Sequence, residues 1–394
     1  MPWKETHKMN QRTEFVIKSM NANNFRELCR EYGISTKTGY KWKERFVKNG
    51  LEGMKEESRK PNGHASELGE EVICKIVQLK TAHPHWGPRK IRALYERKMT
   101  GEVPSESSFK RVLERAGLTE SRKKRRKRDS SQRLTTGRKA EKPNEVWTVD
   151  FKGWWKDREG LRVEPLTVRD EYSRMLLDVR LLEDSRTASV KACFERLFER
   201  HGLPEAIRSD NGAPFASVQG LLGLSRLSAW WLALGIDLER SRPGCPQDNG
   251  AHERMHLDIL RELQNAKVGK DQDAFDVWRN EYNYERAHES LGMKLPSEMY
   301  QNSDRKWSGT PDDIEYGAMT TRRVHKTGTI HFEGESIMLS TTLAGWSVGL
   351  NPLPEGFIEV WFAELIIGHI DPETWSFRAA RVQRTEAGQT ETKV

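Results

Sequence analysis

A block of positive charge about one third of the way along the chain limits how this chain can fold. Residues 121–142 hold 11 Lys or Arg and two Asp or Glu, a net charge of +9, whereas the whole 394-residue chain has a net charge of +8. Seven cations follow one another from Arg122 to Arg128. Such a run repels itself and cannot form a core, so it predicts an exposed basic linker between separately folded parts. It gains energy by meeting a polyanion, so we expect a nucleic-acid partner, although a merely solvated linker is the simpler interpretation.

Length, cysteine usage and hydropathy set further limits. A chain of 394 residues predicts two to four domains. Its cysteines, Cys29, Cys74, Cys193 and Cys245, lie far apart without a C-x-x-C pair, which favours a reducing compartment. The sequence has no apolar run of 18 residues and no signal-peptide pattern, so we expect neither a membrane span nor secretion.

The residues before the linker predict two helical domains, at 1–60 and 67–120. In the first, Phe25, Leu28, Cys29 and Tyr32 recur with helical spacing, Gly33 interrupts the pattern, and Ser35 can cap a second helix. That second helix carries Lys37, Lys41, Lys43 and Arg45. A helix, a glycine turn and a basic helix are typical of a helix-turn-helix, with a plain helical hairpin as the alternative.

The second helical domain gives a weaker signal. Ser105 and Ser108 precede a third helical stretch and could again mark a turn followed by a recognition helix. His83, His85 and Cys74 do not have the spacing of a zinc site, so we expect no zinc there.

After the linker the pattern changes to alternating strands and helices. Strands are predicted within 145–151, 162–170 and 174–182, followed by an amphipathic helix that Ser185 can cap. Val190, Phe194, Leu197 and Phe198 share one face of that helix. A strand near 206, an apolar helix within 221–235, a strand near 238 and helices at about 249–265 and 271–288 complete an α/β core at 143–305. Short strands separated by Gly and Pro predict a small all-β barrel at 318–385.

Two carboxylates stand where strands of the core end. Asp150 ends the apolar run "VWTVD", and Asp210 follows "AIRS" immediately before "NG". An acid in such a run is costly unless it is paired or binds a cation, and strand-end carboxylates can converge at one edge of a sheet. Four other acids compete with them, namely Asp157, Asp170, Asp178 and Glu183. Most of these are better explained as turn or solvent-facing residues, although Asp170 also ends a strand.

The stretch "GCPQDNGAHERMH", residues 244–256, offers two more acids, Asp248 and Glu253. Asn249 can cap the helix that follows, which leaves Asp248 before the cap and in solvent. Helical spacing aligns Glu253 with Leu257, Leu260 and Gln264, and places Arg254, Asp258 and Arg261 on another, polar face. The helix is therefore expected to aim Glu253 toward the domain body. A buried Glu is disfavoured unless it helps to hold a metal, and three carboxylates suit divalent cations that act at phosphorus.

Several motifs together resemble a known family. They are "VWTVDFKG" (146–153), "DEYSR" (170–174), "IRSDNGAPF" (207–215), "GCPQDNGAHERMH" (244–256) and "YNYERAHESLGMKLPSEMY" (282–300), with "WGPRKI" (86–91) upstream. The chain is similar over about residues 10–300 to DDE transposases of bacterial insertion sequences, which share the RNase H-like catalytic core of retroviral integrases. The resemblance makes Asp150, Asp210 and Glu253 the catalytic, metal-binding acids.

The chain also departs from the family pattern. The spacing from Asp210 to Glu253 exceeds that of retroviral integrases, and the extra length looks like the helix that contains "LSRLSAWWLALG". Leu260, with Arg261 beside it, stands where the family usually has a basic residue that touches DNA. Helix-turn-helix units replace the zinc-binding module of retroviral integrases.

The resemblance implies an enzyme that uses two Mg²⁺ or Mn²⁺ ions, without a nucleotide cofactor, to cut the end of a mobile element and join its 3′-OH to target DNA. Its partners would be double-stranded DNA and further copies of itself, in the cytoplasm of a bacterium at the nucleoid. The expected DNA-binding residues are Lys37, Lys41, Arg45, Arg89, Lys110, Arg122, Lys123, Lys124, Arg125, Arg126, Lys127, Arg128, Asn211, Gln247, Asn249, Arg254 and Arg261. A catalytically silent DNA-binding regulator and a nuclease of RNase H-like fold are the alternatives.

Overall fold

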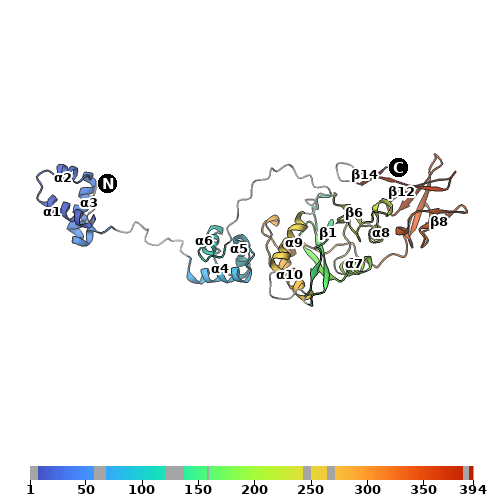
Figure 1. Cartoon of the computed structure of the whole chain (residues 1–394), viewed down its shortest axis with the longest axis horizontal. Coiled ribbons are helices and arrows are strands. Elements are labelled where there is room, and N and C mark those ends of the chain that lie inside the picture. Colours follow the sequence, from blue (N-terminus) through green and yellow to red (C-terminus); the bar gives the residue numbers. More distant parts are fainter. Residues whose placement is uncertain are drawn as a thin grey trace. The chain divides into compact units, whose positions relative to one another are not determined.

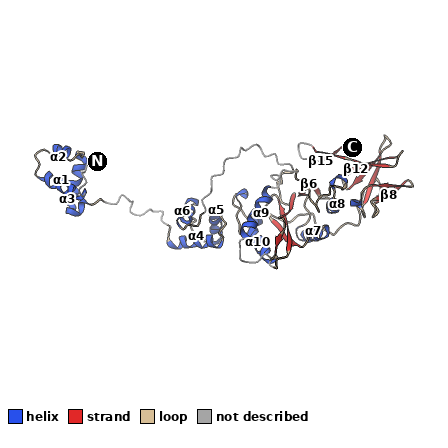
Figure 2. Cartoon of the chain, in the orientation of Figure 1, coloured by secondary structure: helices blue, strands red, loops and turns tan. Residues whose placement is uncertain are grey.

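The structure is a computed structural model of the whole chain. It describes residues 8–56, 68–119, 137–157, 159–242, 250–263, 271–384 and 390–393. The chain divides into two compact units, Met1–Gly69 and Glu70–Val394, which are described separately (Figure 1). Figure 2 shows helices alone in the first unit and both helices and strands in the second. Within the described residues, no helix combines the length and the apolar character that a membrane crossing requires.

The first unit is the predicted helix-turn-helix. It comprises α1 (Lys8–Met20), α2 (Phe25–Glu31), α3 (Thr36–Asn49) and the 3-10 turn η1 (Gly50–Met54). Gly33 adopts a positive φ of 65° between α2 and α3, and the Ser35 hydroxyl accepts the Thr38 N–H as the predicted cap. A Cβ at Gly39 would lie 2.7 Å from the Sγ of Cys29, so glycine allows α3 to approach α2 closely.

The second unit begins with α4 (Glu70–Ala82), α5 (Pro88–Lys98) and α6 (Glu106–Arg115), which pack against one another. Ser105 caps α6 by accepting the Ser108 N–H. The fully buried side chains at the centre of this helical module come from all three helices; they are Ile76, Ile91, Leu94, Phe109 and Leu113.

The α/β core is built on a mixed six-stranded sheet. Its strands are β1 (Val146–Phe151), β2 (Trp155–Lys156), β3 (Arg162–Asp170), β4 (Leu176–Leu182), β5 (Ala206–Ser209) and β6 (Asp237–Arg240). The order is β2-β3-β1-β5-β6, with β4 paired to β3. The first strands pair in antiparallel fashion, whereas β5 is parallel to both β1 and β6, as the change of pattern along the sequence predicts.

Helices cover both faces of this sheet (Figure 1). On one face, α7 (Thr187–His201) and α8 (Arg226–Ala233) enclose a core that includes Trp147 and Val149 of β1. On the other face, α9 (Gly250–Leu263) and α10 (Gln272–Tyr284) pack over β4. A short α11 (Pro296–Met299) follows the 3-10 turn η4 (Glu289–Leu291). The predicted apolar face of α7 is confirmed, because all four of its residues are buried, namely Val190, Phe194, Leu197 and Phe198.

The predicted cap of α7 was wrong. The helix begins at Thr187, so Arg186 occupies the cap position and makes no side-chain capping bond. Asp184 instead orders the entry to the helix, because its carboxylate accepts hydrogen bonds from the Arg186 N–H (2.9 Å) and the Ser189 hydroxyl (2.7 Å). The negative charge of Asp184 also interacts favourably with the N-terminal end of the helix dipole.

The apolar helix α8 is buried on two sides. Leu227, Trp230 and Trp231 pack into the sheet core, whereas Ala229 and Leu232 belong to the core of the C-terminal strands. A helix that is apolar all round needs such double burial. The extra length between Asp210 and Glu253 therefore provides the surface on which the C-terminal domain packs.

The C-terminal domain is all-β, but the predicted barrel is not confirmed. One sheet has the order β13 (Ser376–Ala379), β12 (Leu365–Asp371), β11 (Ile358–Phe362), β10 (Ser347–Pro352) and β7 (Thr320–Arg323). Within the part of the chain that the structure describes, β7 and β13 are open edges that do not pair with each other. The hairpin of β8 (Thr329–Phe332) and β9 (Glu335–Met338) contacts both edges, and β14 (Arg381–Arg384) pairs with β15 (Thr390–Lys393). Short strands with Gly and Pro between them do not specify closure, which depends on strand tilt and register.

Candidate active site

The two strand-end aspartates lie side by side because of the register between β1 and β5. Thr148 of β1 is the parallel partner of Arg208 of β5. Asp150 and Asp210 each follow two residues later, Asp150 within β1 and Asp210 directly after β5. The carboxyl ends of neighbouring parallel strands meet at one edge of a sheet. The structure thus brings together the two aspartates that the sequence singled out.

Glu253 stands in the first turn of α9, but the predicted orientation of this helix was wrong. Glu253 is exposed, and Leu257, expected on the inward face with it, is 45% exposed. The inward face instead contains His252, Met255, His256, Ile259 and Leu263. Asp258, expected on the polar outer face, is buried and pairs with Arg286 at 2.7 Å. The alignment of Glu253 with leucines predicted the wrong orientation for α9, because His252 and His256 face the sheet at the start of the helix.

Glu253 is nevertheless close enough to Asp150 to interact with it electrostatically. Burial, together with the negative charges of Asp210 and Glu253, raises the pKa of Asp150 to about 7. The backbone N–H of Phe151 and the charge of Lys152 oppose this rise. A carboxylate group that resists losing its proton for these reasons gains most from a nearby cation. An all-oxygen donor set of this kind fits a hard divalent ion such as Mg²⁺ or Mn²⁺.

The three acids do not form a closed cage. Across the described ranges, no three His, Cys, Asp or Glu side chains stand close enough together to hold a metal ion. The same result covers the group Cys74, His83 and His85 in the second helical module. The side chain of Glu253 is exposed on its helix, and the carboxylate of Asp210 faces its own turn, where it accepts the Gly212 N–H at 3.1 Å.

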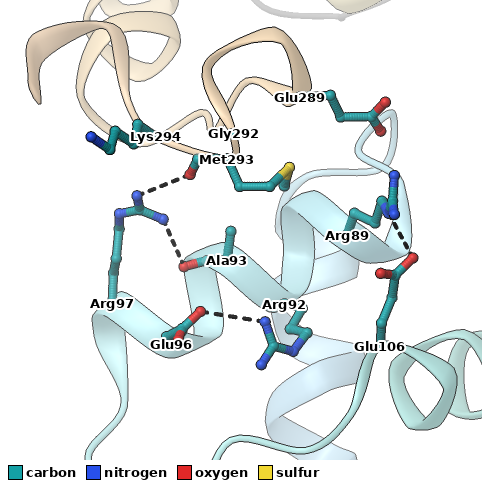
Figure 3. Close-up of a pocket in the computed structure, with 10 residues that line it drawn as sticks. All are labelled: Arg89, Arg92, Ala93, Glu96, Arg97, Glu106, Glu289, Gly292, Met293 and Lys294. Carbon is teal, nitrogen blue, oxygen red and sulfur yellow. Dashed lines mark hydrogen bonds and ion pairs between the residues drawn. The ribbon is translucent and has the colours of Figure 1, made fainter. Parts of the chain in front are cut away.

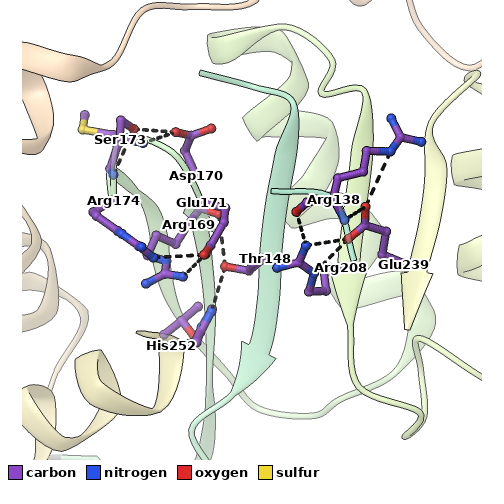
Figure 4. Close-up of polar contacts among 12 residues, drawn as sticks. Arg138, Thr148, Arg169, Asp170, Glu171, Ser173, Arg174, Arg208, Glu239 and His252 are labelled. Carbon is purple, nitrogen blue, oxygen red and sulfur yellow. Dashed lines mark hydrogen bonds and ion pairs between the residues drawn. The ribbon is translucent and has the colours of Figure 1, made fainter. Parts of the chain in front are cut away.

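The competing acid Asp170 has a structural task. Its carboxylate accepts both the N–H (2.7 Å) and the hydroxyl (2.6 Å) of Ser173 (Figure 4). It also accepts the N–H of Asn144 (2.7 Å). These bonds satisfy the buried acid and hold the turn between β3 and β4. The "DEYSR" motif is thus a turn that supports β1 and β3.

Two further competitors also have structural partners. Asp157 accepts the N–H groups of Glu159 and Leu161 in a turn, as expected for a turn acid. Asp178 is buried, contrary to the expectation of a turn or solvent-facing acid, and lies 3.4 Å from both Arg180 and Arg279.

Two cations near the aspartates were missed by the sequence analysis. Lys152 interacts electrostatically with Asp150, two residues before it. Arg240 pairs with Ser209 in the parallel register of β5 and β6, and its Nη1 donates to the Ser209 hydroxyl (3.1 Å) and the Asp210 carbonyl (3.3 Å). Burial lowers the pKa of Arg240 to about 10, which leaves it charged at neutral pH. Its position at the end of a strand parallel to β5 was the available signal.

The predicted DNA contacts on α3 are partly exposed. Lys37 and Lys41 lie on the outer face of the helix, whereas Arg45 is half-buried with its guanidinium 5.3 Å from the ring centre of Trp42. The same outer face carries Tyr40, which is 60% exposed, and Val47, which is 72% exposed. Base edges present apolar thymine methyl groups, so these two residues add to the candidate reading surface.

Arg89 and Lys110 in the second helical module both have acidic partners. Arg89 pairs with Glu106 at 2.7 Å, and Lys110 with Glu114 at 3.7 Å. Arg89 also lines a hollow of about 570 Å³ (Figure 3). One wall of the hollow is α5 and the other is the loop at 289–294, so this is a junction within the second unit.

The remaining predicted contacts lie near the acids or outside the described residues. The Asn211 side chain donates to the Ser241 carbonyl at 2.6 Å, and Arg254 and Arg261 are exposed on α9. Several predictions concern residues that the structure does not describe; these are Arg122, Lys123, Lys124, Arg125, Arg126, Lys127, Arg128, Cys245, Gln247, Asp248 and Asn249.

Comparisons with known families match the helical N-terminal part and the α/β core of the chain. Residues 140–246 and 234–296 match two families that are each described as an integrase core domain. The first range contains Asp150 and Asp210, and the second contains Glu253. Residues 11–62 match a helix-turn-helix domain, and residues 38–113 match a homeodomain-like domain.

Relatives occur in bacterial insertion elements. The chain is 27% identical over 235 residues to the uncharacterized 31.7 kDa protein of insertion element IS407 of Burkholderia multivorans, a match that covers 58% of this chain and 80% of that protein. It is 26% identical over 237 residues to the uncharacterized 39.2 kDa protein of IS476 of Xanthomonas euvesicatoria, covering 59% of this chain and 65% of that protein. Among solved structures, the catalytic core domain of HTLV-2 integrase matches with 15% identity and a TM-score of 0.31, over 41% of this chain and all of that chain.

The integrase-core matches and the insertion-element relatives agree with each other. The matched ranges contain the sheet and helices that carry the three acids, and the helix-turn-helix match contains most of α1 and all of α2 and α3. The chain therefore contains an integrase core domain and helix-turn-helix domains, and its insertion-element relatives support polynucleotidyl transferase activity of the transposase kind.

Proposed function

We propose that this transposase cuts the ends of a mobile element and joins them to target DNA at a site made by Asp150, Asp210 and Glu253. The observation that carries the proposal is the convergence of these acids: the register of β1 and β5 places Asp150 beside Asp210, and burial together with the charges of Asp210 and Glu253 raises the pKa of Asp150. A structural acid is normally given hydrogen-bond donors or a cationic partner, as Asp170 and Asp258 are. Acids that converge at neighbouring strand ends and raise the pKa of one of their number are typical of a site that receives a cation.

Each residue has a separate task in this proposal. Asp150 and Asp210 would hold Mg²⁺ or Mn²⁺ from the sheet edge, and Glu253 would complete the donor set from α9. Two bound ions would supply activation of the attacking water or 3′-OH and stabilise the charge that develops on the leaving oxygen. Lys152 and Arg240 stand beside the aspartates, where they would hold the DNA backbone near the scissile phosphate.

DNA binding would be divided among several parts of the chain. The exposed face of α3, with Lys37, Tyr40 and Lys41, would read the element ends, and Arg45 would support it. Lys110 on α6, together with Asn211, Arg254 and Arg261 around the acids, would contact DNA, as would the basic residues 122–128. Phosphate contacts of this kind make affinity strongly dependent on salt. Arg89 is a weaker candidate, because it faces Glu106.

The proposal also includes the assembly and the place of action. Two element ends must be joined together, so the active form would be a homo-oligomer on DNA, at the nucleoid of a bacterium. The chain would be organised as helical domains at 1–60 and 67–120, a basic linker at 121–142, the core at 143–305 and the β domain at 318–385.

The proposal is tested with the full chain and a supercoiled plasmid that carries the DNA flanking its gene. We expect Mg²⁺-dependent 3′-OH formation and joining to a second plasmid, and loss of both in Asp150→Asn, Asp210→Asn and Glu253→Gln. Asp157→Asn is the matched control, because Asp157 is a turn acid. Full activity in the Glu253→Gln variant would contradict the site.

The two alternatives give different results in the same assay. A silent regulator would bind the flanking DNA without cutting it, and a nuclease would cut without joining. The helix-turn-helix unit, with its exposed basic face, favours duplex DNA over an RNA–DNA hybrid as substrate.

A further inference from the structure

Two buried histidines of α9 lie on either side of Glu253 in the sequence and face the sheet. His252 is fully buried, and His256 nearly so. The two ring nitrogens of His252 lie 3.0 Å from the Thr148 hydroxyl of β1 and 2.5 Å from the Thr167 hydroxyl of β3. Figure 4 shows the His252 ring reaching from α9 to Thr148. The Nε2 of His256 lies 2.8 Å from the same Thr167 hydroxyl.

Thr167 also binds the backbone of the first candidate metal ligand. It is the cross-strand partner of Asp150 in the antiparallel register of β1 and β3. Its hydroxyl donates to the Asp150 carbonyl at 2.9 Å. A hydroxyl has one hydrogen to give and two lone pairs, so Thr167 must then accept the N–H of each histidine. These three hydrogen bonds use the one hydrogen and both lone pairs of the Thr167 hydroxyl. They connect β3 with β1 and α9.

This network fixes the histidine tautomers. Both rings must present an N–H at Nε2, so the Nδ1 of His252 is an acceptor. It shares the single hydrogen of the Thr148 hydroxyl (3.0 Å) with the Arg169 carbonyl (3.3 Å). The Nδ1 of His256 lies 4.0 Å from the Asp150 carboxylate. Directional bonds of this kind determine where a helix sits along a strand, whereas apolar packing tolerates small shifts.

We propose that Thr167 is a positioning residue that fixes the distance between Glu253 and Asp150. The inference rests on the proposed function, because it matters only if these acids bind the same metal ions. Because Glu253 is exposed, surrounding side chains do not fix its carboxylate. The distance from this carboxylate to the aspartates therefore depends on where α9 lies. His252 and His256 lie one residue before and three residues after it, and both bind Thr167. Groups that orient metal ligands typically change metal affinity by about 10- to 100-fold when they are removed.

The deciding experiment compares two substitutions of the same residue in the full chain. Thr167→Val keeps the shape of the side chain but removes the hydroxyl, whereas Thr167→Ser keeps the hydroxyl. Mn²⁺ binding is measured without DNA, by the loss of the free-ion electron paramagnetic resonance signal. We expect Thr167→Val to bind Mn²⁺ about tenfold more weakly, and Thr167→Ser to bind it within about twofold of the wild-type affinity.

A structural control separates positioning from stability. Ser173→Ala removes a buried hydroxyl that donates to Asp170 in a turn of the same sheet. We expect it to lower the melting temperature comparably with Thr167→Val while leaving Mn²⁺ affinity unchanged. If Thr167→Val does not fold, Thr148→Val takes its place, since it removes one bond to His252 and should weaken Mn²⁺ binding by a smaller factor.

Each result bears on one of the two proposals. Wild-type Mn²⁺ affinity in folded Thr167→Val, or in Thr148→Val where that variant replaces it, overturns the positioning role if Asp150→Asn loses Mn²⁺ binding. Wild-type affinity in Asp150→Asn itself instead contradicts the proposed metal site. Equal loss of Mn²⁺ affinity in Thr167→Val and Thr167→Ser would also overturn the inference, because the hydroxyl would then not be the relevant group.

Discussion

Arg97 of α5 forms an ion pair with Glu298 of α11, 201 residues later in the chain, at 3.3 Å. Arg97 also donates to the Met293 carbonyl at 3.1 Å, across the hollow in Figure 3. Lys98 pairs with Glu285 at 2.8 Å, and His83 lies 2.7 Å from Glu281. The "WGPRKI" helix, which resembles part of a DNA-binding module, thus contacts the catalytic core. This face of the second helical module is engaged in docking.

The docking contact predicts coupled effects of charge reversal. Arg97→Glu and Glu298→Arg should each lower the free energy of unfolding by on the order of 1 kcal/mol, since each opposes like charges at a half-exposed site. The double variant should recover part of that loss, but not all of it, because the carboxylate introduced by Arg97→Glu cannot donate to the Met293 carbonyl. Urea unfolding of the four proteins measures the coupling. Purely additive losses would show that Arg97 and Glu298 do not interact. The same charge reversals at the Arg92–Glu96 pair are the control, because that ion pair lies within α5 and does not join α5 to another element.

The sequence predicted those parts of the fold that follow from local patterns. Strand-end position identified Asp150 and Asp210, and the parallel register of β1 and β5 then placed them together. Helix phase failed for α9, because His252 and His256 face polar threonines that only the folded sheet supplies. Such a pairing joins residues about 100 positions apart, which periodicity cannot detect. The same reason explains why Arg240, a neighbour of Asp210 through β6, was missed.

Asp150 should destabilise the fold at neutral pH in the absence of metal. Its folded-state pKa of about 7 exceeds its ordinary value of 3.8, so between these values the folded state holds a proton that the unfolded chain has lost. Stability therefore falls as pH rises through this window. Asp150→Asn should stabilise the metal-free protein at pH 8 by on the order of 2 kcal/mol.

Thermal unfolding at pH 8 checks this prediction. Added Mn²⁺ should raise the melting temperature of the wild-type protein and leave that of Asp150→Asn almost unchanged, because a ligand stabilises only the state that binds it. The exposed Glu159→Gln is the control for loss of one negative charge. If the metal-free Asp150→Asn variant melted below the wild type, the Asp150 carboxylate would not destabilise the fold as the raised pKa predicts.

His201 should make the fold sensitive to acid. Burial lowers its pKa to about 4, against an ordinary value of 6.5, while its Nδ1 lies 3.2 Å from the Asn302 side-chain oxygen. Between these pH values the unfolded chain binds a proton that the folded state does not, so stability falls as pH falls. His201→Phe should reduce this slope by up to roughly 1.4 kcal/mol per pH unit. Urea unfolding from pH 7 to 5 measures it, with the exposed His85→Asn as control; an unchanged slope would be inconsistent with a neutral, buried His201.

Arg240 should contribute one phosphate contact at the active site. It remains charged beside Asp210, and its Nη1 bonds to Ser209 and to the Asp210 carbonyl fix its direction. Arg240→Gln should weaken binding of duplex DNA several-fold and reduce the slope of log affinity against log salt by about one. Arg378→Gln, which removes the same charge from a pair with Asp371 on the C-terminal sheet, is the matched control and should leave the slope unchanged. Equal slopes for Arg240→Gln and the wild type would show that Arg240 does not contact a phosphate, because binding with one phosphate contact fewer releases fewer counterions.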